Sequence, residues 1–468
     1  MNNELHAIVD YDDSYVQPII VQALQSQLGS TCTIHTNPST LPPTTPTHLL
    51  QIRSYETLDF EHGTTAPSTL MNAYVIRKAL IRKHYLSNLV HQYTAKRPDS
   101  TLGKHFKRAE DFELDYAEFL DEALVECFEL RASFERNEAR GAGEEEGREW
   151  WILKPSMSDR GQGIRLFSGE EELRGIFEKW EEENPDSDND DGEDDDDGHD
   201  ASNQVAESEV DDGTEAAMNG GSVVDEHAKS DRDYIVTSHL RHFIVQPYIH
   251  PPLLLPDAPY NNRKFHIRTY VVAAGALRVY VYGHMLALFA SEPYSPPRSS
   301  SDASETDGTT DNDVELLQRM RNIHLTNTCV QKSLGHENID EDNVFLLSKL
   351  LLPTEVLNSI TQQIRDTTCD LFCAAASQPT NFQALGNAFE VFGLDFLVDE
   401  AHNVWLLEVN AFPDFKQTGE ELKEVVIRGL WEDIVKVVVR PHFDGGVVAA
   451  KEGSKSLLKV LDLDMGRG

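Results

Sequence analysis

Cysteine and long apolar runs are scarce in this chain. It has 5 Cys in 468 residues, and none of them is spaced as in a CxxC motif. A disulfide framework and a zinc site are therefore not expected. No apolar run reaches the ~18 residues of a membrane span, and the first residues lack the basic-then-apolar pattern of a signal peptide. We therefore expect a soluble, cytoplasmic protein with reduced thiols.

Basic residues are also scarce, with 41 Lys and Arg against 80 Asp and Glu. They form no basic stripe interleaved with aromatic side chains, so direct binding of nucleic acid is not expected. The 40% of hydrophobic residues can fill a sizeable core, and the length suits about two or three domains. The composition therefore favours a globular protein that is not bound to a membrane.

The acidic excess is concentrated in one segment. Glu181–Asp233 holds 22 Asp and Glu against 2 Lys and Arg, a net charge of −20, which is about half of the formal −39. Such a segment has too little apolar content to offset the entropy of ordering, and we expect a disordered insert. A functional alternative is an acidic arm that contacts a basic partner. The Ser-, Asp- and Pro-rich stretch Ser291–Asp313 is expected to be a second insert.

The order of expected elements indicates an α/β (α+β) fold. Strand, helix, strand and helix alternate at the N-terminus, which is typical of a small α/β domain, and strands dominate later. No internal repeat is visible. We expect antiparallel sheets with flanking helices in a central and a C-terminal domain. The expected boundaries are 1–95, 96–290 and 314–445, followed by a tail over 446–468.

The stretch from Phe392 to Asn410 predicts a β-hairpin with oxygen ligands on one face. Glu408 and Asn410 lie two residues apart and therefore point to the same side of a strand. If the hairpin folds about Ala401, Asp395 lies opposite Glu408. Two carboxylates and an amide oxygen are suited to Mg²⁺ shared with substrate phosphates. The alternative is a polar sheet edge that faces water.

Two further segments carry groups for anions. Lys154 ends an apolar strand and is followed by a loop with Gly161 and Gly163, where amides could approach phosphate oxygens. The alternative is an ordinary glycine turn. Lys264, His266 and Arg268 alternate with apolar residues, so they share one strand face that suits phosphates or carboxylates. The alternative there is an exposed basic face.

Phrases, more than single residues, resemble a known family. WILKPSMSDRGQGI, IVQPYIHPPLLL, RKFHIRTYVV, HLTNTCVQK and FEVFGLDFLVDEAHNVWLLEVNAFP occur in the order of the tubulin-tyrosine ligase family, within the ATP-grasp superfamily. The resemblance covers about 150–413, and the IRKAL phrase around Lys78 looks like the smaller leading domain. The ending VNAFPDFKQTG resembles a fungal branch whose members often carry a SurE-like domain, which we expect this chain to lack.

The resemblance implies an ATP-grasp fold and an ATP-dependent amino-acid ligase that forms a peptide bond through an acyl phosphate. It implies ATP and Mg²⁺ as cofactors, a free amino acid and a protein acceptor, tubulin or another protein, as partners, and a monomer. The implied metal ligands are Asp395, Glu408 and Asn410, and the implied catalytic residues are Arg268, Lys264 and Asn327. The implied nucleotide contacts are Lys154, Ser156, Gly161, Gly163, Gln246, Tyr248, Ile249 and Lys78.

Two residues depart from the family pattern. Pro247 stands where the family usually has a lysine that contacts adenine, and His266 stands where it has an aspartate. These departures favour an alternative in which the chain is an inactive relative that serves as a binding module. A second alternative is an ATP-grasp ligase that acts on a small molecule. The intact metal and phosphate residues favour a working enzyme.

Overall fold

A computed structural model describes residues 5–42, 46, 48–140, 147–156, 163–183, 242–298, 311–326, 343–444 and 454–464. Residues 184–233 of the expected acidic insert, and residues 299–310 of the expected insert 291–313, lie outside these residues. Within the described part no helix is long and apolar enough to cross a membrane. Four cysteines are described, and all four are free thiols.

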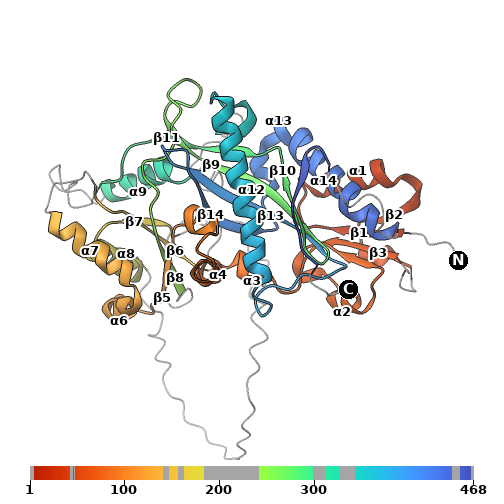
Figure 1. Cartoon of the computed structure of the whole chain (residues 1–468), viewed down its shortest axis with the longest axis horizontal. Helices are drawn as coiled ribbons and strands as arrows, with labels where there is room; N and C mark the ends of the chain where they lie inside the picture. Colours follow the sequence, from red (N-terminus) through yellow and green to blue (C-terminus); the bar gives the residue numbers. More distant parts are fainter. Residues whose placement is uncertain are drawn as a thin grey trace, which may run out of the picture.

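The N-terminal region forms a parallel four-stranded sheet in the order β2-β1-β3-β4 (Figure 1). Its strands are β1 (Leu5–Asp10), β2 (Cys32–His35), β3 (His48–Arg53) and β4 (Thr69–Met71). α1 (Gln17–Leu28) connects β1 to β2 and buries Ile19, Ile20, Ala23 and Leu24. The central residues of β1 and β3 are almost all buried, as is typical of parallel strands covered on both faces.

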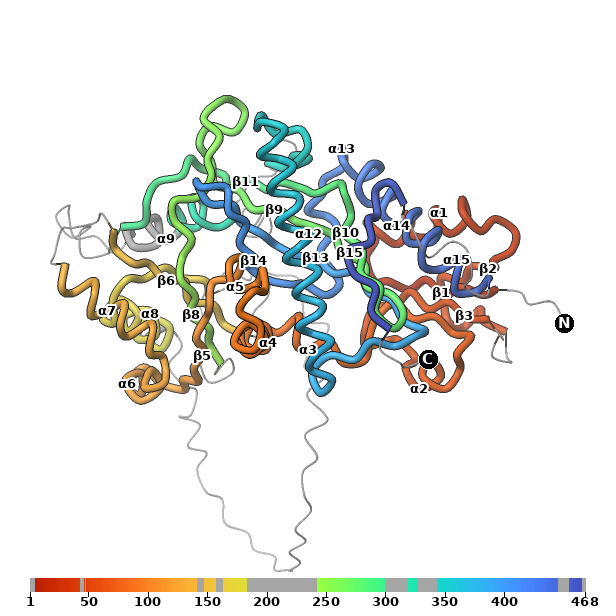
Figure 2. Tube along the Cα trace, viewed as in Figure 1, coloured from red at the N-terminus to blue at the C-terminus, as the bar shows by residue number. Residues whose placement is uncertain are grey.

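The central region is an antiparallel sheet in the order β5-β8-β6-β7. The strands are β5 (Glu110–Glu113), β6 (Trp151–Pro155), β7 (Arg165–Phe167) and β8 (His242–Pro247). α6 (Leu120–Ala123), α7 (Phe128–Arg140) and α8 (Glu170–Glu183) lie beside this sheet (Figure 2). Phe177, Trp180 and Phe243 form the aromatic centre of the core between them.

A seven-stranded sheet forms the largest layer. β9 (Arg263–Ala274) pairs with β13 (Phe389–Val398) along one side, and with β11 (Leu286–Pro293) and β10 (Arg278–Tyr282) along the other. β14 (Val404–Ala411) extends the sheet beyond β13, β12 (Val344–Leu346) beyond β11, and β15 (Leu457–Asp462) beyond β10. All residues of β9 are buried. This strand is therefore the central support of the sheet.

Helices cover both faces of this sheet. α12 (Thr354–Ala376) packs on one face (Figure 1). On the other, α13 (Gly419–Lys423), α14 (Gly429–Ile434) and α15 (Arg440–Phe443), joined by π-helical turns, share a core with α1. The remaining α-helices of the described residues are α2 (Phe60–Thr65), α3 (Lys78–Ile81), α4 (Lys83–Lys96), α5 (Leu102–His105) and α9 (Asp311–His324).

Two features bear on the expected division of the chain. The large sheet crosses residue 290, because β9 pairs with β13, and β10 and β11 pair with β9 and not with the central sheet. The stretch expected to be a tail contributes β15, whose Leu457 is fully buried. The pairing of β strands that are far apart in sequence therefore sets the layers, and composition alone does not mark them.

Candidate active site

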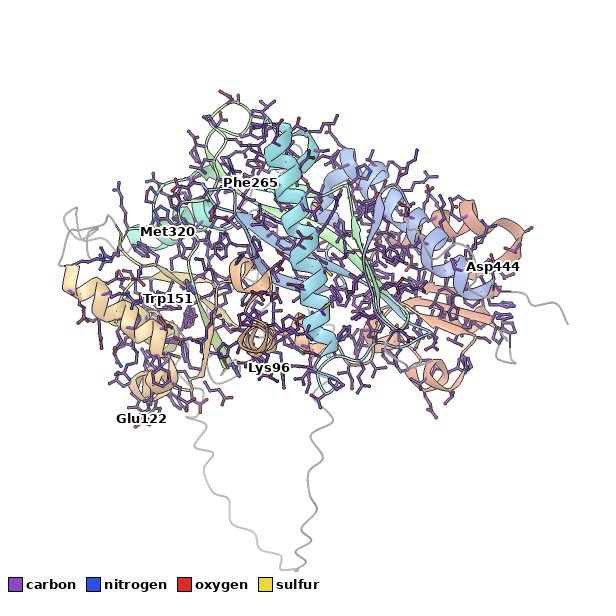
Figure 3. All side chains as sticks on the ribbon, in the orientation of Figure 1. Lys96, Glu122, Trp151, Phe265, Met320 and Asp444 are labelled. Atoms are coloured by element: carbon purple, nitrogen blue, oxygen red, sulfur yellow. The ribbon has the colours of Figure 1, made fainter. Side chains whose placement is uncertain are left out.

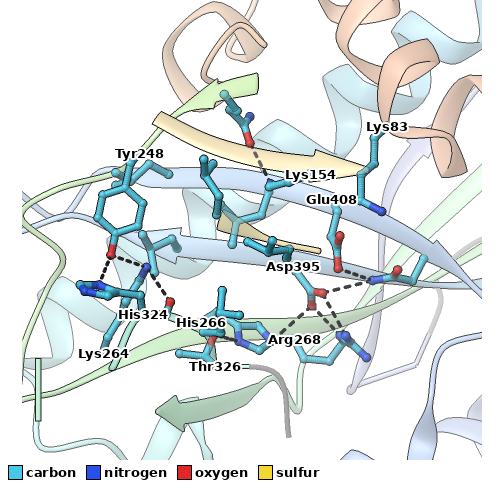
Figure 4. Close-up of a pocket in the computed structure, with 18 of the residues that line it drawn as sticks. Lys83, Lys154, Tyr248, Lys264, His266, Arg268, His324, Thr326, Asp395 and Glu408 are labelled. Atoms are coloured by element: carbon cyan, nitrogen blue, oxygen red, sulfur yellow. Dashed lines mark hydrogen bonds and ion pairs between the residues drawn. The ribbon is translucent and has the colours of Figure 1, made fainter. Parts of the chain in front are cut away.

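A cavity of about 390 Å³ lies where the central sheet faces the large sheet. The central sheet contributes side chains of β6 and β8, and the large sheet contributes β9, β13 and β14 (Figure 4). Lys83 at the start of α4 and His324 at the end of α9 also line it. Strands from two separate sheets thus aim polar side chains into one cavity.

The hairpin β13–β14 has the register that its sequence predicts. Asp395 pairs with Glu408, and a bulge follows directly after Asp395. The Asn410 side-chain nitrogen donates to Asp395 Oδ2 at 3.1 Å and to Glu408 Oε1 at 3.3 Å. Asp395 is only 4% exposed, which excludes the water-facing sheet edge. The three side chains therefore form one corner of the cavity, the carboxylate corner, in which Asp395 is buried and Glu408 and Asn410 are half-buried.

Arg268 extends the line of charges onto β9, where it pairs with Asp395 in the register. Its guanidinium donates to both Asp395 oxygens, at 2.5 and 2.9 Å. Burial acts to lower the pKa of Arg268, but Asp395 outweighs it and raises the pKa. Burial raises the pKa of Asp395 to about 6, although Arg268 opposes the shift. Arg268 is therefore held charged and fixed in direction by a bidentate contact.

Lys154 faces the carboxylate corner from the central sheet. Its Nζ donates to Gln246 Oε1 at 2.9 Å, and burial lowers its pKa to about 8 although Glu408 opposes the shift. Burial acts to raise the pKa of Glu408, but Lys83 and Lys154 outweigh it and bring the pKa to about 2. Glu408 is therefore ionised at neutral pH, and Lys154 is a buried cation ready to meet an anion.

A second polar group lies at the other end of the cavity. Lys264 Nζ donates to Tyr248 Oη at 2.9 Å and to the His324 carbonyl at 3.1 Å. Burial, and then Lys154, lower the pKa of Lys264 to about 7. His266 Nδ1 lies 2.5 Å from Thr326 Oγ1. Because Lys264 and His266 are 6% exposed each, they do not form the exposed basic face that was the alternative.

The carboxylate corner fits a hard divalent cation. In the described part of the chain no three His, Cys, Asp or Glu side chains cluster as a complete metal site. Asp395 and Glu408 supply two carboxylates, and the Asn410 side-chain nitrogen donates to both of them. The space between the two carboxylates therefore favours a positive charge. Mg²⁺ commonly takes one or two carboxylates and completes its shell with water and substrate phosphates. The donor set therefore suits Mg²⁺ bound together with a nucleotide.

Several residues expected at the site from the sequence lie in the cavity lining. These are Lys154, Gln246, Tyr248, Ile249, Lys264, Arg268, Asp395, Glu408 and Asn410, together with Pro247 and His266. Ser156 and Gly163 are not among the lining residues, and Ser156 lies 2.7 Å from His84. Gly161 and Asn327 lie outside the described residues.

Sequence reasoning missed Lys83, His324 and Thr326. Lys78, which the IRKAL phrase indicates, lies against the Tyr85 ring, and Lys83 lines the cavity. Lys83 follows five residues later in the same basic run and begins α4, whereas Lys78 begins α3, so the basic run itself was the available signal. His324 and Thr326 belong to the HLTN phrase, in which only Asn327 was singled out.

Comparison with known proteins agrees with this geometry. The model of the "Tubulin-tyrosine ligase family" matches residues 66–445. "Probable tubulin--tyrosine ligase PBY1" of Saccharomyces cerevisiae is 42% identical over 83% of this chain and 45% of that protein. "Probable tubulin--tyrosine ligase C12B10.04" of Schizosaccharomyces pombe is 37% identical over 98% of both chains. The chain thus spans less than half of the budding-yeast relative.

A solved structure gives the same result for the fold. The C-terminal domain of K. lactis Pby1, described as an ATP-grasp enzyme interacting with the mRNA decapping enzyme Dcp2, matches with a TM-score of 0.64. It is 33% identical, and the match covers 98% of this chain and 99% of that domain. These matches confirm the expected α/β ATP-grasp fold and the class of ATP-dependent ligase. The chain belongs to the tubulin-tyrosine ligase family.

Proposed function

We propose that the chain joins a carboxylate to an amine at the expense of ATP, with a protein as acceptor and a free amino acid as second substrate. The observation that carries the proposal is that Lys154 and the carboxylate corner line one cavity. In a space of low dielectric, fixed charges act strongly on a phosphate that changes charge. Binding and electrostatics are then the main contributions of the protein.

Each group has a role that follows from its position. Asp395, Glu408 and Asn410 would hold Mg²⁺, which offsets charge on the phosphates when bound. Lys154 would bind phosphate oxygens, with Gln246 fixing its direction. The side of the cavity formed by Tyr248 and Ile249 would border the base of the nucleotide.

Arg268 and Lys264 would act on the acceptor side. Arg268 donates to both oxygens of Asp395 through Nε and Nη2, so its guanidinium is held in one orientation before substrate binds. It would hold the substrate carboxylate or acyl phosphate. Lys264 is buried, and its pKa is lowered to about 7. An anionic substrate bound beside it would raise that pKa and favour the charged amine.

A second candidate function is that of a binding partner in mRNA decapping. The K. lactis relative is described as interacting with Dcp2, and this chain resembles it over 98% of its length. Pro247, at the end of β8 in the cavity lining, removes the side-chain amine that the family usually has there. A cytoplasmic location suits both functions.

Calorimetric titration of Mg-ATP tests the proposal. Wild type is expected to bind saturably and only with Mg²⁺ present, and the Glu408→Gln, Asn410→Ala double variant is expected to lose that binding. Glu400→Gln is the matched control, because Glu400 is exposed in the turn of the same hairpin. Absence of Mg-ATP binding by wild type would sink the ligase and favour the binding partner. Binding retained by the double variant would sink the metal assignment.

A further inference from the structure

An apolar patch lies on the surface of the central region, between β5 and α7. Tyr116, Phe119, Val125 and Phe128 are 40%, 46%, 54% and 70% exposed. They are four of the seven large hydrophobic side chains exposed in the described part of the chain, and they fall within thirteen residues. Tyr116 and Phe119 contact each other edge to face, with ring centroids 6.3 Å apart. Exposed apolar side chains gathered in one short segment in this way are candidates for an interaction site.

The patch is not needed to fill the core. Ala117, Leu120, Leu124, Cys127 and Leu130 occupy the inward positions of the same segment and pack against the central sheet. The exposed residues fall between them and face outward. Figure 3 places Glu122, in the same segment, at the outer edge of the molecule. No residue of 110–130 lines the candidate active site, so the patch is separate from it.

The surroundings of the patch are acidic. Residues 110–130 contain nine Asp and Glu and no Lys or Arg. Asp121 pairs with Arg174, and Asp111 pairs with His242 at 3.0 Å. Glu118, Glu122, Glu126 and Glu129 are exposed beside the apolar side chains. An acidic ligand, including the acidic stretch 184–233 of this chain, would be repelled here, whereas a basic one would be attracted.

We propose that this surface, Tyr116 to Glu129, docks a basic peptide segment of a partner protein that carries aromatic or aliphatic side chains between its lysines and arginines. The apolar side chains would be covered by the hydrophobic residues of that segment, and the surrounding glutamates would pair with its cations. Aromatic residues such as Phe119 and Phe128 are the kind that anchor interfaces. The proposal does not depend on catalysis.

Selection from a phage-displayed library of random twelve-residue peptides against the full chain tests the proposal. The expected sequences combine Lys or Arg with Leu, Phe or Trp, and a labelled copy is then titrated by fluorescence anisotropy. Phe119→Ser with Phe128→Ser is expected to weaken its binding at least tenfold. Glu122→Gln with Glu126→Gln is expected to weaken binding and to reduce its dependence on salt.

The matched control is Leu351→Ser with Val425→Ser, which removes two exposed hydrophobic side chains elsewhere, at 65% and 49% exposure. It should leave peptide binding unchanged. Mg-ATP titration and thermal unfolding of every variant check that the fold is intact. Three outcomes would overturn the proposal: no enriched peptide, enriched peptides without basic residues, or equal loss in the control. Concentration-dependent dimerisation abolished by the Phe variants would also overturn it and assign the patch to a second copy.

Discussion

Gly393 lies at a place where a single added methyl group should disturb the candidate site. A Cβ at this position would lie 2.8 Å from Pro413 Cβ and 3.3 Å from Arg268 Cδ. Apolar carbons settle about 3.5–4.0 Å apart, so Gly393→Ala requires a shift of roughly 1 Å. Pro413 is rigid, and Arg268 is held by Asp395 on two bonds, so neither neighbour can yield without moving the cavity wall.

The size of the effect follows from that shift. Overpacking of a well-filled site costs about 1–3 kcal/mol of stability. A displacement of roughly 1 Å at groups that position a substrate can cost up to ~10²-fold in rate. We expect Gly393→Ala to unfold at a lower temperature and to bind Mg-ATP about tenfold more weakly, which corresponds to ~1.4 kcal/mol.

Calorimetric titration and thermal unfolding measure both effects, with Gly175→Ala as control. Gly175 lies in α8, where an added Cβ meets nothing within 4 Å. The control is expected to gain up to ~1 kcal/mol from helix propensity and to bind Mg-ATP as wild type does. If Gly393→Ala matches wild type in stability and in affinity, the reasoning from close packing at the cavity wall is refuted.

Two further predictions concern stability. Burial lowers the pKa of His84 to about 4 from its usual 6.5. Between these two pH values the unfolded chain binds a proton at His84 and the folded chain does not, so the free energy of unfolding decreases as pH falls from 6.5 towards 4. Urea unfolding should show a loss of roughly 1 kcal/mol at pH 5 after screening, absent in His84→Gln. Leu457→Ala in β15 should lower the free energy of unfolding by about 2–5 kcal/mol, because Leu457 is fully buried, whereas Leu351→Ala at an exposed position should lower it by less than ~0.5 kcal/mol. Equal effects of the two substitutions would mean that β15 is not part of the core.

The local part of the site could be predicted from the sequence because its geometry is local. Alternation along one strand places Lys264, His266 and Arg268 on one face, and the cavity lining contains all three. A short hairpin leaves few registers, so the pairing of Asp395 with Glu408 follows from the turn between them. Both predictions are confirmed because they require only the period of a strand and the length of a turn.

The contacts between distant segments could not be predicted in this way. Nothing in the pattern around Lys154 states that the central sheet faces β14, and nothing in 446–468 states that β15 pairs with β10. Lys78 and Lys83 are five residues apart but begin two different helices, and which of them reaches the cavity depends on how α3 and α4 pack. These placements follow from the packing of sheets, which the sequence of one segment does not contain.

The cavity lining has a slight excess of basic side chains, although the chain as a whole is strongly acidic. The chain has 80 acidic against 41 basic residues, whereas the cavity lining has Lys83, Lys154, Lys264 and Arg268 against three carboxylates. Burial lowers the pKa values of Lys154 and Lys264, so the folded protein holds these amines at a cost. A polyphosphate that carries net negative charge with its divalent cation would restore their protonation and offset that cost. Buried groups with strongly shifted pKa values are typical of functional sites, where a bound ligand offsets the cost of burying them. The lining therefore favours a bound nucleotide over a purely structural role for these lysines.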